Sequence, residues 1–348
     1  MSDRHAPGRH RTLLQRTGRP RGQNRRQPLR RHHVRAVLTP IVVAGFVVAG
    51  AAVPLAAATP EGAAPAVSPS APSTAPADDS TAAATAAAAA AATGKAKLGM
   101  SAPQAEWAQR VREVGPGLQA RRVFVNSLSG SLGVATQACQ DGMYPVISFA
   151  PGSYSWTQVA NGAADSALRS LATKLGALPC DAFAAIAHEP NGDGTPAQWS
   201  AMQAHALPLL GADPGVKVGV IGNGWWWSST SKGLSDAQLA AWIPRSVINV
   251  SDVIAGDTYQ GVAGGEEPAN KMANMASWAR RVGGVKALGL GEFNAQSAAG
   301  ITAITSKLAS DSLWQWGCLW NANGGGGAHS TVLTGDRLAA FKKALASW

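Results

Sequence analysis

Outside its first 35 residues, this 348-residue chain has no net excess of charge, although the whole sequence carries a formal charge of +10. Eleven arginines lie between positions 4 and 35, and Asp3 is the acidic residue beside them. The rest of the chain holds 19 basic and 19 acidic residues. A high pI that comes from one short tail is no evidence for a nucleic-acid-binding surface. We therefore expect no nucleic-acid partner.

Metal and nucleotide motifs are also missing from the sequence. There is no His-x-x-x-His spacing and no closely spaced cysteine pair, and no G-x-G-x-x-G follows the first strand-like run at 96–102. His188, Glu189 and Asp257 could compete as metal ligands. However, within residues 95–348, His329 is the only histidine besides His188 that lies outside a helical pattern. We expect no metal and no cofactor.

Cysteine is scarce, with residues 139, 180 and 318 as the only three. The arginine-rich tail precedes an apolar segment from Val37 to Ala58, which predicts a secretory signal or an uncleaved signal anchor over 1–58. Either places the rest of the chain in the secreted or extracellular cell-surface compartment, with the membrane contacted only through an anchor. Export favours oxidation, so a Cys139–Cys180 disulfide is plausible. The alternative is three buried, reduced thiols, and Cys318 is expected to be free in either case.

Large apolar residues are nearly absent from 59–94, where Ala, Pro, Ser and Thr dominate. A segment with so little to bury is expected to be a disordered linker. The folded domain should therefore span 95–348, which is long enough for one core.

Short apolar runs alternate with helical patterns through this domain. Nearly continuous apolar runs are typical of strands covered on both faces, as in parallel sheets. Eight strands alternating with helices over about 250 residues indicate an α/β fold, a single (β/α)8 TIM barrel. A doubly wound sheet has the same alternation but lacks support from a glycine-rich loop. The predicted strands are 96–102, 121–126, 144–151, 182–189, 216–223, 252–259, 287–294 and 313–320.

Polar and aromatic residues gather where these strands end, and barrel active sites lie at the carboxyl ends of strands. One carboxylic acid and one carboxylate are what glycoside hydrolysis needs, while indole rings stack on sugar faces. The chain has 12 Trp against 3 Tyr and 6 Phe, and much of the Trp lies at strand ends. The predicted catalytic residues are Glu189 and Glu292, and the predicted substrate-binding residues are His188, Asn223, Trp225, Trp226, Asp257, Tyr259 and Trp320.

Three short motifs carry a family resemblance. "AHEPNG" (187–192), "DVIAGDTY" (252–259) and "GEFN" (291–294) resemble glycoside hydrolase family 26 of the retaining (β/α)8 glycosidase clan. The resemblance implies that Glu189 is the general acid/base and Glu292 the nucleophile, with His188 and Tyr259 supporting them. It also implies an endo-acting β-mannanase-like hydrolase.

In a barrel, strands 4 and 7 lie on nearly opposite walls, so the two glutamates should face each other across the mouth. We expect the carboxyl separation of about 5–5.5 Å that retention requires. The Glu189 pKa should be raised and Glu292 should stay ionised. The predicted function is a secreted, monomeric retaining hydrolase of a β-linked polysaccharide, with β-mannan favoured over β-glucan or xylan. The alternative is a non-catalytic carbohydrate-binding barrel at the cell surface.

Overall fold

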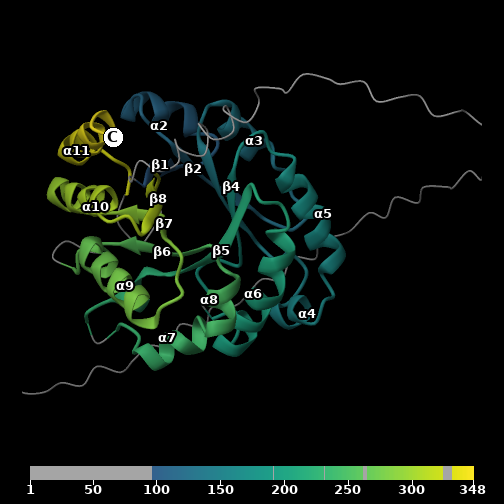
Figure 1. Ribbon diagram of the computed structural model, residues 1–348. Helices are drawn as coiled ribbons and strands as arrows, with labels where there is room; N and C mark the ends of the chain where they lie inside the picture. The colour runs from purple at the N-terminus through teal and green to yellow at the C-terminus, as the bar shows by residue number, and fades with distance from the viewer. Residues whose placement is uncertain (1–95, 191, 231, 262–264, 324–330) are drawn as a thin grey trace, which may run out of the picture. The chain divides into compact units, whose positions relative to one another are not determined.

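The computed structural model describes residues 96–348, except 191, 231, 262–264 and 324–330. The predicted signal or anchor, the predicted linker and His329 lie outside the described residues. Eight parallel strands pair in chain order, and the last pairs with the first, so the sheet closes into a barrel (Figure 1). This confirms the predicted fold class. The strands are β1 (Lys97–Ser101), β2 (Ala120–Val125), β3 (Tyr144–Phe149), β4 (Ala182–Ile186), β5 (Val216–Asn223), β6 (Val253–Tyr259), β7 (Leu288–Asn294) and β8 (Trp314–Trp320).

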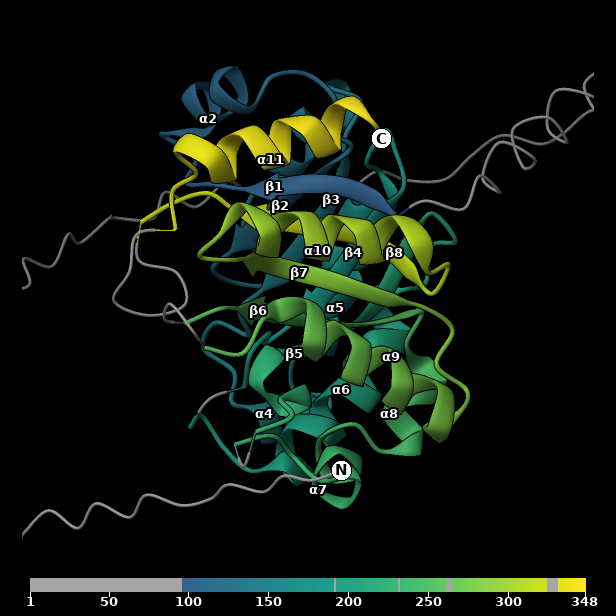
Figure 2. The ribbon, with the colours of Figure 1, turned by 90° about the vertical axis from the view of Figure 1, so that its left-hand side faces the viewer.

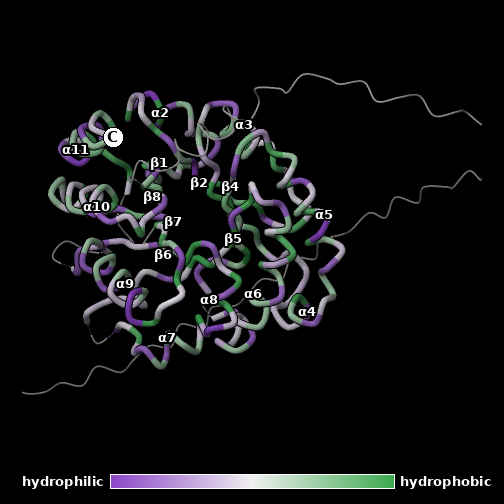
Figure 3. Tube along the Cα trace, in the orientation of Figure 1, coloured by the Kyte–Doolittle hydropathy of each residue, from purple (hydrophilic) through white to green (hydrophobic). Residues whose placement is uncertain are grey.

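Helices surround the strands, as the side view in Figure 2 makes clear. Several of them alternate between hydrophobic and hydrophilic residues along their length (Figure 3), as helices with one buried face do. They are α2 (Trp107–Val114), α3 (Gly133–Gln140), α4 (Trp156–Ala160), α5 (Asp165–Gly176), α6 (Pro196–Leu210), α7 (Asp236–Trp242), α8 (Arg245–Val250), α9 (Pro268–Val282), α10 (Ala298–Ser310) and α11 (Gly335–Ala346), with the 3₁₀ helix η2 (Gly224–Trp227).

The helix α6 begins where its sequence predicts. The Thr195 hydroxyl accepts a hydrogen bond from the Gln198 backbone N–H, the Gln198 side chain accepts one from the Thr195 backbone N–H, and Pro196 occupies the first turn. This start matters for the site, because α6 packs directly behind the end of β4.

The strand β4 is shorter than predicted. It ends at Ile186 instead of continuing to Glu189. Ala187 and Glu189 have φ values of 47° and 49°, in the left-handed region that residues with a Cβ seldom adopt. The chain therefore kinks at the point where the sequence pattern continued the strand.

The barrel interior is filled with side chains. Phe183 and Trp316 lie in ring contact with centroids 4.9 Å apart. The indole of Trp316 covers Gly289, where an added Cβ would lie only 2.6 Å from the ring. A second and larger apolar layer separates the strands from the helices. The closed core leaves the two ends of the barrel as the places where a substrate could bind.

A disulfide joins Cys139, in α3, to Cys180, just before β4. Cys318 is free and buried inside the barrel. Both outcomes agree with the prediction, and the alternative of three reduced thiols is wrong. Within the described residues, no helix has the length and apolar character that a membrane span requires.

Candidate active site

The two predicted catalytic carboxylates lie at the carboxyl ends of their strands. Glu292 lies within β7, and Glu189 follows β4 after the kink. The Tyr259 hydroxyl donates a short hydrogen bond to Glu292 Oε2, and the Ser101 hydroxyl donates to Oε1 at 3.4 Å. Side chains from β1 and β6 therefore hold Glu292 in position.

The kink that aims Glu189 is held from behind by α6. Trp199 Nε1 donates to the Ala187 carbonyl oxygen at 2.9 Å, and Gln203 Nε2 donates to the Ile186 carbonyl oxygen at 2.7 Å. From the barrel side, the Glu189 backbone N–H donates to the carbonyl oxygen of Ile221 in β5 at 2.9 Å. A strained backbone persists only where its surroundings fix it, and here both sides do so.

Burial and the negative charge of Glu292 together raise the pKa of Glu189 to about 7, against Arg122, which lowers it. The direction agrees with the prediction for a general acid. Burial also raises the pKa of Glu292, against Arg122, Tyr259 and Ser101, which lower it. Glu292 was expected to stay ionised; its burial works against this expectation, whereas Arg122 and the two hydroxyl donors favour the ionised form.

Arg122 is a functional candidate that the sequence analysis missed. It lies on β2, buried inside the barrel, and its Nη1 donates to the Val146 carbonyl oxygen at 3.4 Å. Its Nε and Nη2 have no hydrogen-bond partner among the described residues. Its positive charge lowers the pKa of Glu189, Asp257 and Glu292. A pair of arginines, Arg121 and Arg122, inside an otherwise apolar strand was the available signal.

Asp257 lies deeper than predicted. Asp257 is only 3% exposed, and among the described side chains none donates a hydrogen bond to its carboxyl group, although the backbone N–H of Glu292 lowers its pKa. Burial and the charges of Glu292 and Glu189 raise its pKa well above the usual range. Asp257 lies against the two glutamates and is nearly closed to solvent, and its role as a substrate-binding residue stays a prediction.

His188 is half-buried beside the pair, and burial together with Arg122 lowers its pKa to about 3. It is therefore neutral over the physiological range. One ligand atom each of His188, Glu189 and Asp257 lie within 4.8 Å of one another, so these three side chains could hold a cation. A cation there would occupy the Glu189 oxygen that a general acid needs, so the two uses exclude each other.

The three consecutive tryptophans of η2 have three different environments. Trp225 is 41% exposed, whereas Trp226 is 1% exposed and forms a cluster with the rings of Trp199 and Trp242, each of which contacts the other two. Trp227 packs against Trp278 of α9. The prediction that Trp226 binds substrate is wrong, because its indole belongs to the layer between barrel and helices. Trp225 stays a candidate.

Two glycines make room for the buried indoles. An added Cβ at Gly222 would lie 2.5 Å from the Trp226 ring, and one at Gly256 would lie 2.8 Å from the Trp227 ring. Each glycine immediately precedes a predicted site residue, Asn223 or Asp257. Successive strand residues face opposite sides, so the glycines face the helices while the polar residues face the barrel interior.

The remaining predicted residues lie at the same end of the barrel. Asn223 is buried, and its amide donates to the Pro190 carbonyl oxygen at 3.4 Å, so it supports the Glu189 loop. Its contact with substrate stays a prediction. Trp320 is half-buried and lies in edge contact with Phe124. Phe124 is 42% exposed and was not predicted.

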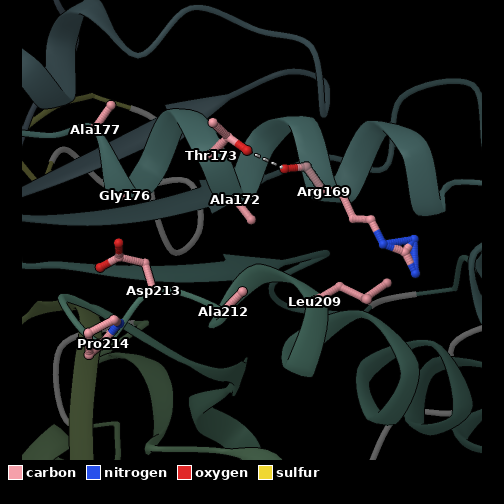
Figure 4. A pocket seen from close by; sticks show the side chains of 9 residues that line it. All are labelled: Arg169, Ala172, Thr173, Gly176, Ala177, Leu209, Ala212, Asp213 and Pro214. Carbon is pink, nitrogen blue, oxygen red and sulfur yellow. Dashed lines mark hydrogen bonds between the residues drawn. The ribbon is translucent and has the colours of Figure 1, made fainter. Parts of the chain in front are cut away.

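The hollow in Figure 4 lies elsewhere. It has a volume of about 580 Å³ and lies between α5, the end of α6 and the segment before β5, with Arg169 and Asp213 among small residues. That segment leads into a strand, so the hollow belongs to the opposite end of the barrel from the carboxylates. A cavity of about 480 Å³ does adjoin the site and is lined by residues of β2, β3 and the loop after β4.

No family model matches the chain, and no curated relative matches it. Solved structures do match. The GH26 domain of an endo-β-mannanase/endo-β-glucanase from Prevotella bryantii superposes with a TM-score of 0.50 at 12% identity, covering 77% of this chain and 94% of that domain. A GH128 endo-β-1,3-glucanase from Sorangium cellulosum gives 0.48 at 16% identity, covering 71% and 98%. The likeness to the GH26 domain establishes the fold: the chain shares its eight-stranded (β/α)8 barrel architecture.

Proposed function

We propose that the chain is a retaining glycoside hydrolase acting on a β-linked polysaccharide. The observation that carries the proposal is the pair of carboxyls at the ends of β4 and β7, of which Glu292 is buried and Glu189 half-buried. Glu292 is held by Tyr259 and Ser101, and Glu189 has a pKa of about 7. A held carboxylate opposite a proton donor is the arrangement that double displacement uses.

In the first step, Glu292 attacks the anomeric carbon while Glu189 donates its proton to the glycosidic oxygen, so the bond to the leaving sugar breaks. In the second step, ionised Glu189 takes a proton from water, and the resulting hydroxide displaces Glu292 from the anomeric carbon. The sugar leaves with its original configuration, and both glutamates return to their starting states. A raised pKa suits Glu189 to both steps, because it must give and then regain a proton near neutral pH.

The substrate proposal is β-mannan first, with β-glucan or xylan next. It is supported by the motif resemblance and by Trp225, an exposed indole at the mouth that could stack on a sugar face. The Prevotella bryantii GH26 domain comes from an endo-β-mannanase/endo-β-glucanase, which makes these two polymers the first to test. Endo action and a monomeric state are part of the same proposal.

The proposed location is outside the cytoplasm, with 1–58 as signal or anchor, 59–94 as linker and the catalytic barrel from 95. The Cys139–Cys180 disulfide supports export, because such bonds persist in oxidising compartments. Expression with an N-terminal epitope and detection of the processed or membrane-bound form would decide between cleavage and anchoring.

The test is hydrolysis of a polysaccharide panel by the full chain, read as new reducing ends. Glu189→Gln and Glu292→Gln should each lower kcat by about 10³-fold or more, since each removes a group that acts in the transition state. Glu113→Gln is the matched control, because Glu113 is a half-buried carboxylate on α2 that pairs with Arg110, away from the proposed site. NMR of the first product should show the retained anomer. Polysaccharide binding without any product would favour the non-catalytic carbohydrate-binding barrel.

A further inference from the structure

The carboxylate pair divides the rim of the barrel into two unequal arcs. The strands are paired in order from β1 to β8, with Glu189 after β4 and Glu292 in β7. One arc between them therefore contains β5 and β6, and the other contains β8, β1, β2 and β3. A sugar chain whose scissile bond lies between the carboxyls extends over one arc on each side.

Each arc carries one exposed large aromatic side chain. Phe124 and Trp225 are the two large hydrophobic residues that are exposed among those the structure describes, at 42% and 41%. Trp225 follows β5, in the short arc, and Phe124 lies near the carboxyl end of β2, in the long arc. Single exposed hydrophobic residues are common on protein surfaces, so exposure alone decides nothing.

The surroundings of Phe124 distinguish it from an incidental surface residue. The guanidinium of Arg122 lies 4.3 Å from the centre of its ring. The His188 ring is 5.4 Å away and the Trp320 ring 6.2 Å away. The ring is thus held in place by residues that also border the carboxylates, while over two fifths of the side chain stays open to solvent.

The open side of Phe124 borders the cavity of about 480 Å³ beside the site. This volume is within the range of sites that bind small ligands. Its lining combines aromatic and polar groups, among them Asn126, Tyr154, Trp156, His188 and Asp193. Flat aromatic faces with nearby hydroxyl, amide and carboxylate groups match the alternating C–H and O–H surfaces of a pyranose.

Resting on the proposed function, we propose that Phe124 and this cavity form a saccharide-binding subsite on the side of the cleaved bond opposite to Trp225. Phe124 is the stacking platform, and Tyr154 borders the space that the sugar fills. The ligand class is a β-linked oligosaccharide that extends past both carboxylates. Removing one of the two aromatic side chains should weaken sugar binding on its own side only. The oligosaccharide should then bind in a position shifted toward the other side.

The test is the position of the cut in linear hexasaccharides. Mannohexaose, cellohexaose and xylohexaose are hydrolysed in ¹⁸O-water by the full chain, and mass spectrometry assigns each labelled fragment to one bond. Phe124→Ala and Trp225→Ala should shift the preferred bond in opposite directions, each changing the ratio of products by about tenfold, as expected for the loss of one stacking contact. The ratio is internal to each sample, so it does not depend on the total activity of the variant.

Tyr154→Ala is the second variant, because Phe124→Ala also exposes Arg122 and could harm folding. It should shift the cut in the same direction as Phe124→Ala. An unchanged product ratio in both variants, or a shift in the same direction as Trp225→Ala, would overturn the subsite while leaving the hydrolase intact. Failure of the unmodified chain to cut any hexasaccharide would instead refute the proposed function, and the subsite with it.

Discussion

The indole N–H of Trp199 donates a hydrogen bond to the carbonyl oxygen of Ala187, two residues before Glu189 in the chain. Gln203, one turn further along α6, does the same for Ile186. Both donors are fully buried, and both bind the segment whose left-handed φ values set the direction of Glu189. The position of the proposed general acid therefore depends on a helix that packs on the outer side of the strands.

Removing either donor should lower turnover more than stability. Trp199→Phe and Gln203→Met keep apolar volume but lose the hydrogen bond, so Glu189 is free to leave its productive position. We expect kcat to fall about 10- to 100-fold with KM nearly unchanged, and the free energy of unfolding to fall by about 1–2 kcal/mol. Kinetics and urea unfolding measure the two effects. Trp278→Phe, a buried indole on α9, should leave kcat close to that of the parent chain; an equal loss there would point to packing alone.

Activity should decline as the pH rises through about 7, because Glu189 then loses the proton that the first step requires. The same shift predicts a stability effect. The Glu189 pKa is raised above its unfolded value of 4.5, so the folded state keeps a proton that the unfolded state has lost between about pH 4.5 and 7. Stability should therefore fall as the pH rises across this window, by up to about 3 kcal/mol.

Glu189→Gln cannot titrate at this position, so its stability should depend less on pH over the same window. Urea unfolding of both proteins at several pH values measures the difference. Parallel pH–stability curves for the two would contradict the raised pKa of Glu189.

Arg122 should set the pH range of the proposed hydrolysis. Arg122→Met removes the positive charge that lowers the Glu189 pKa, so the alkaline limb of kcat/KM should move up by on the order of one unit. Arg121→Met is the matched control on the same strand. Arg121 points the other way, stacks on Trp107 at 3.9 Å and donates to Gln104. Loss of the Arg121 side chain should lower stability and leave the alkaline limb of kcat/KM unchanged. A similar shift of this limb in both variants would therefore argue against a role specific to Arg122.

The disulfide should contribute substantially to stability. It closes a loop of 41 residues, for which the chain-entropy model gives about 4 kcal/mol. Dithiothreitol, or Cys139→Ser together with Cys180→Ser, should lower the urea midpoint accordingly. The urea midpoint of the Cys318→Ala variant should still fall on addition of dithiothreitol, because the Cys318 thiol is free and takes no part in the disulfide. An identical midpoint with and without reductant would mean that the bond adds nothing to stability.

The sequence was sufficient for the barrel and for the ends of most strands. Parallel strands buried on both faces are nearly continuous apolar runs, and the polar residues that close such runs, as at Tyr259 and Asn294, mark strand ends directly. Strand β4 was predicted too long because its apolar pattern continues through Ala187, whereas its end is fixed by hydrogen bonds from α6. Such contacts between segments far apart in the sequence leave no pattern in the residues around the strand end.

Orientation was the other property that the pattern could not supply. Consecutive Trp225 and Trp226 have the same local sequence context, yet one is exposed and the other buried, because a short 3₁₀ helix turns them apart. Arg121 and Arg122 diverge for the simpler reason that strand residues alternate. That alternation could have placed one arginine inside the barrel in advance.

The glycines behind the tryptophans have a consequence for finding relatives of this chain. Gly222 and Gly256 leave room for Trp226 and Trp227, so an indole at either position and a side chain at the facing glycine are incompatible without repacking. Distant barrels that share this arrangement should carry the two features together, a paired signature spread over 35 residues. Because it reflects packing between strands and helices, this signature could persist in chains whose catalytic glutamates have been replaced.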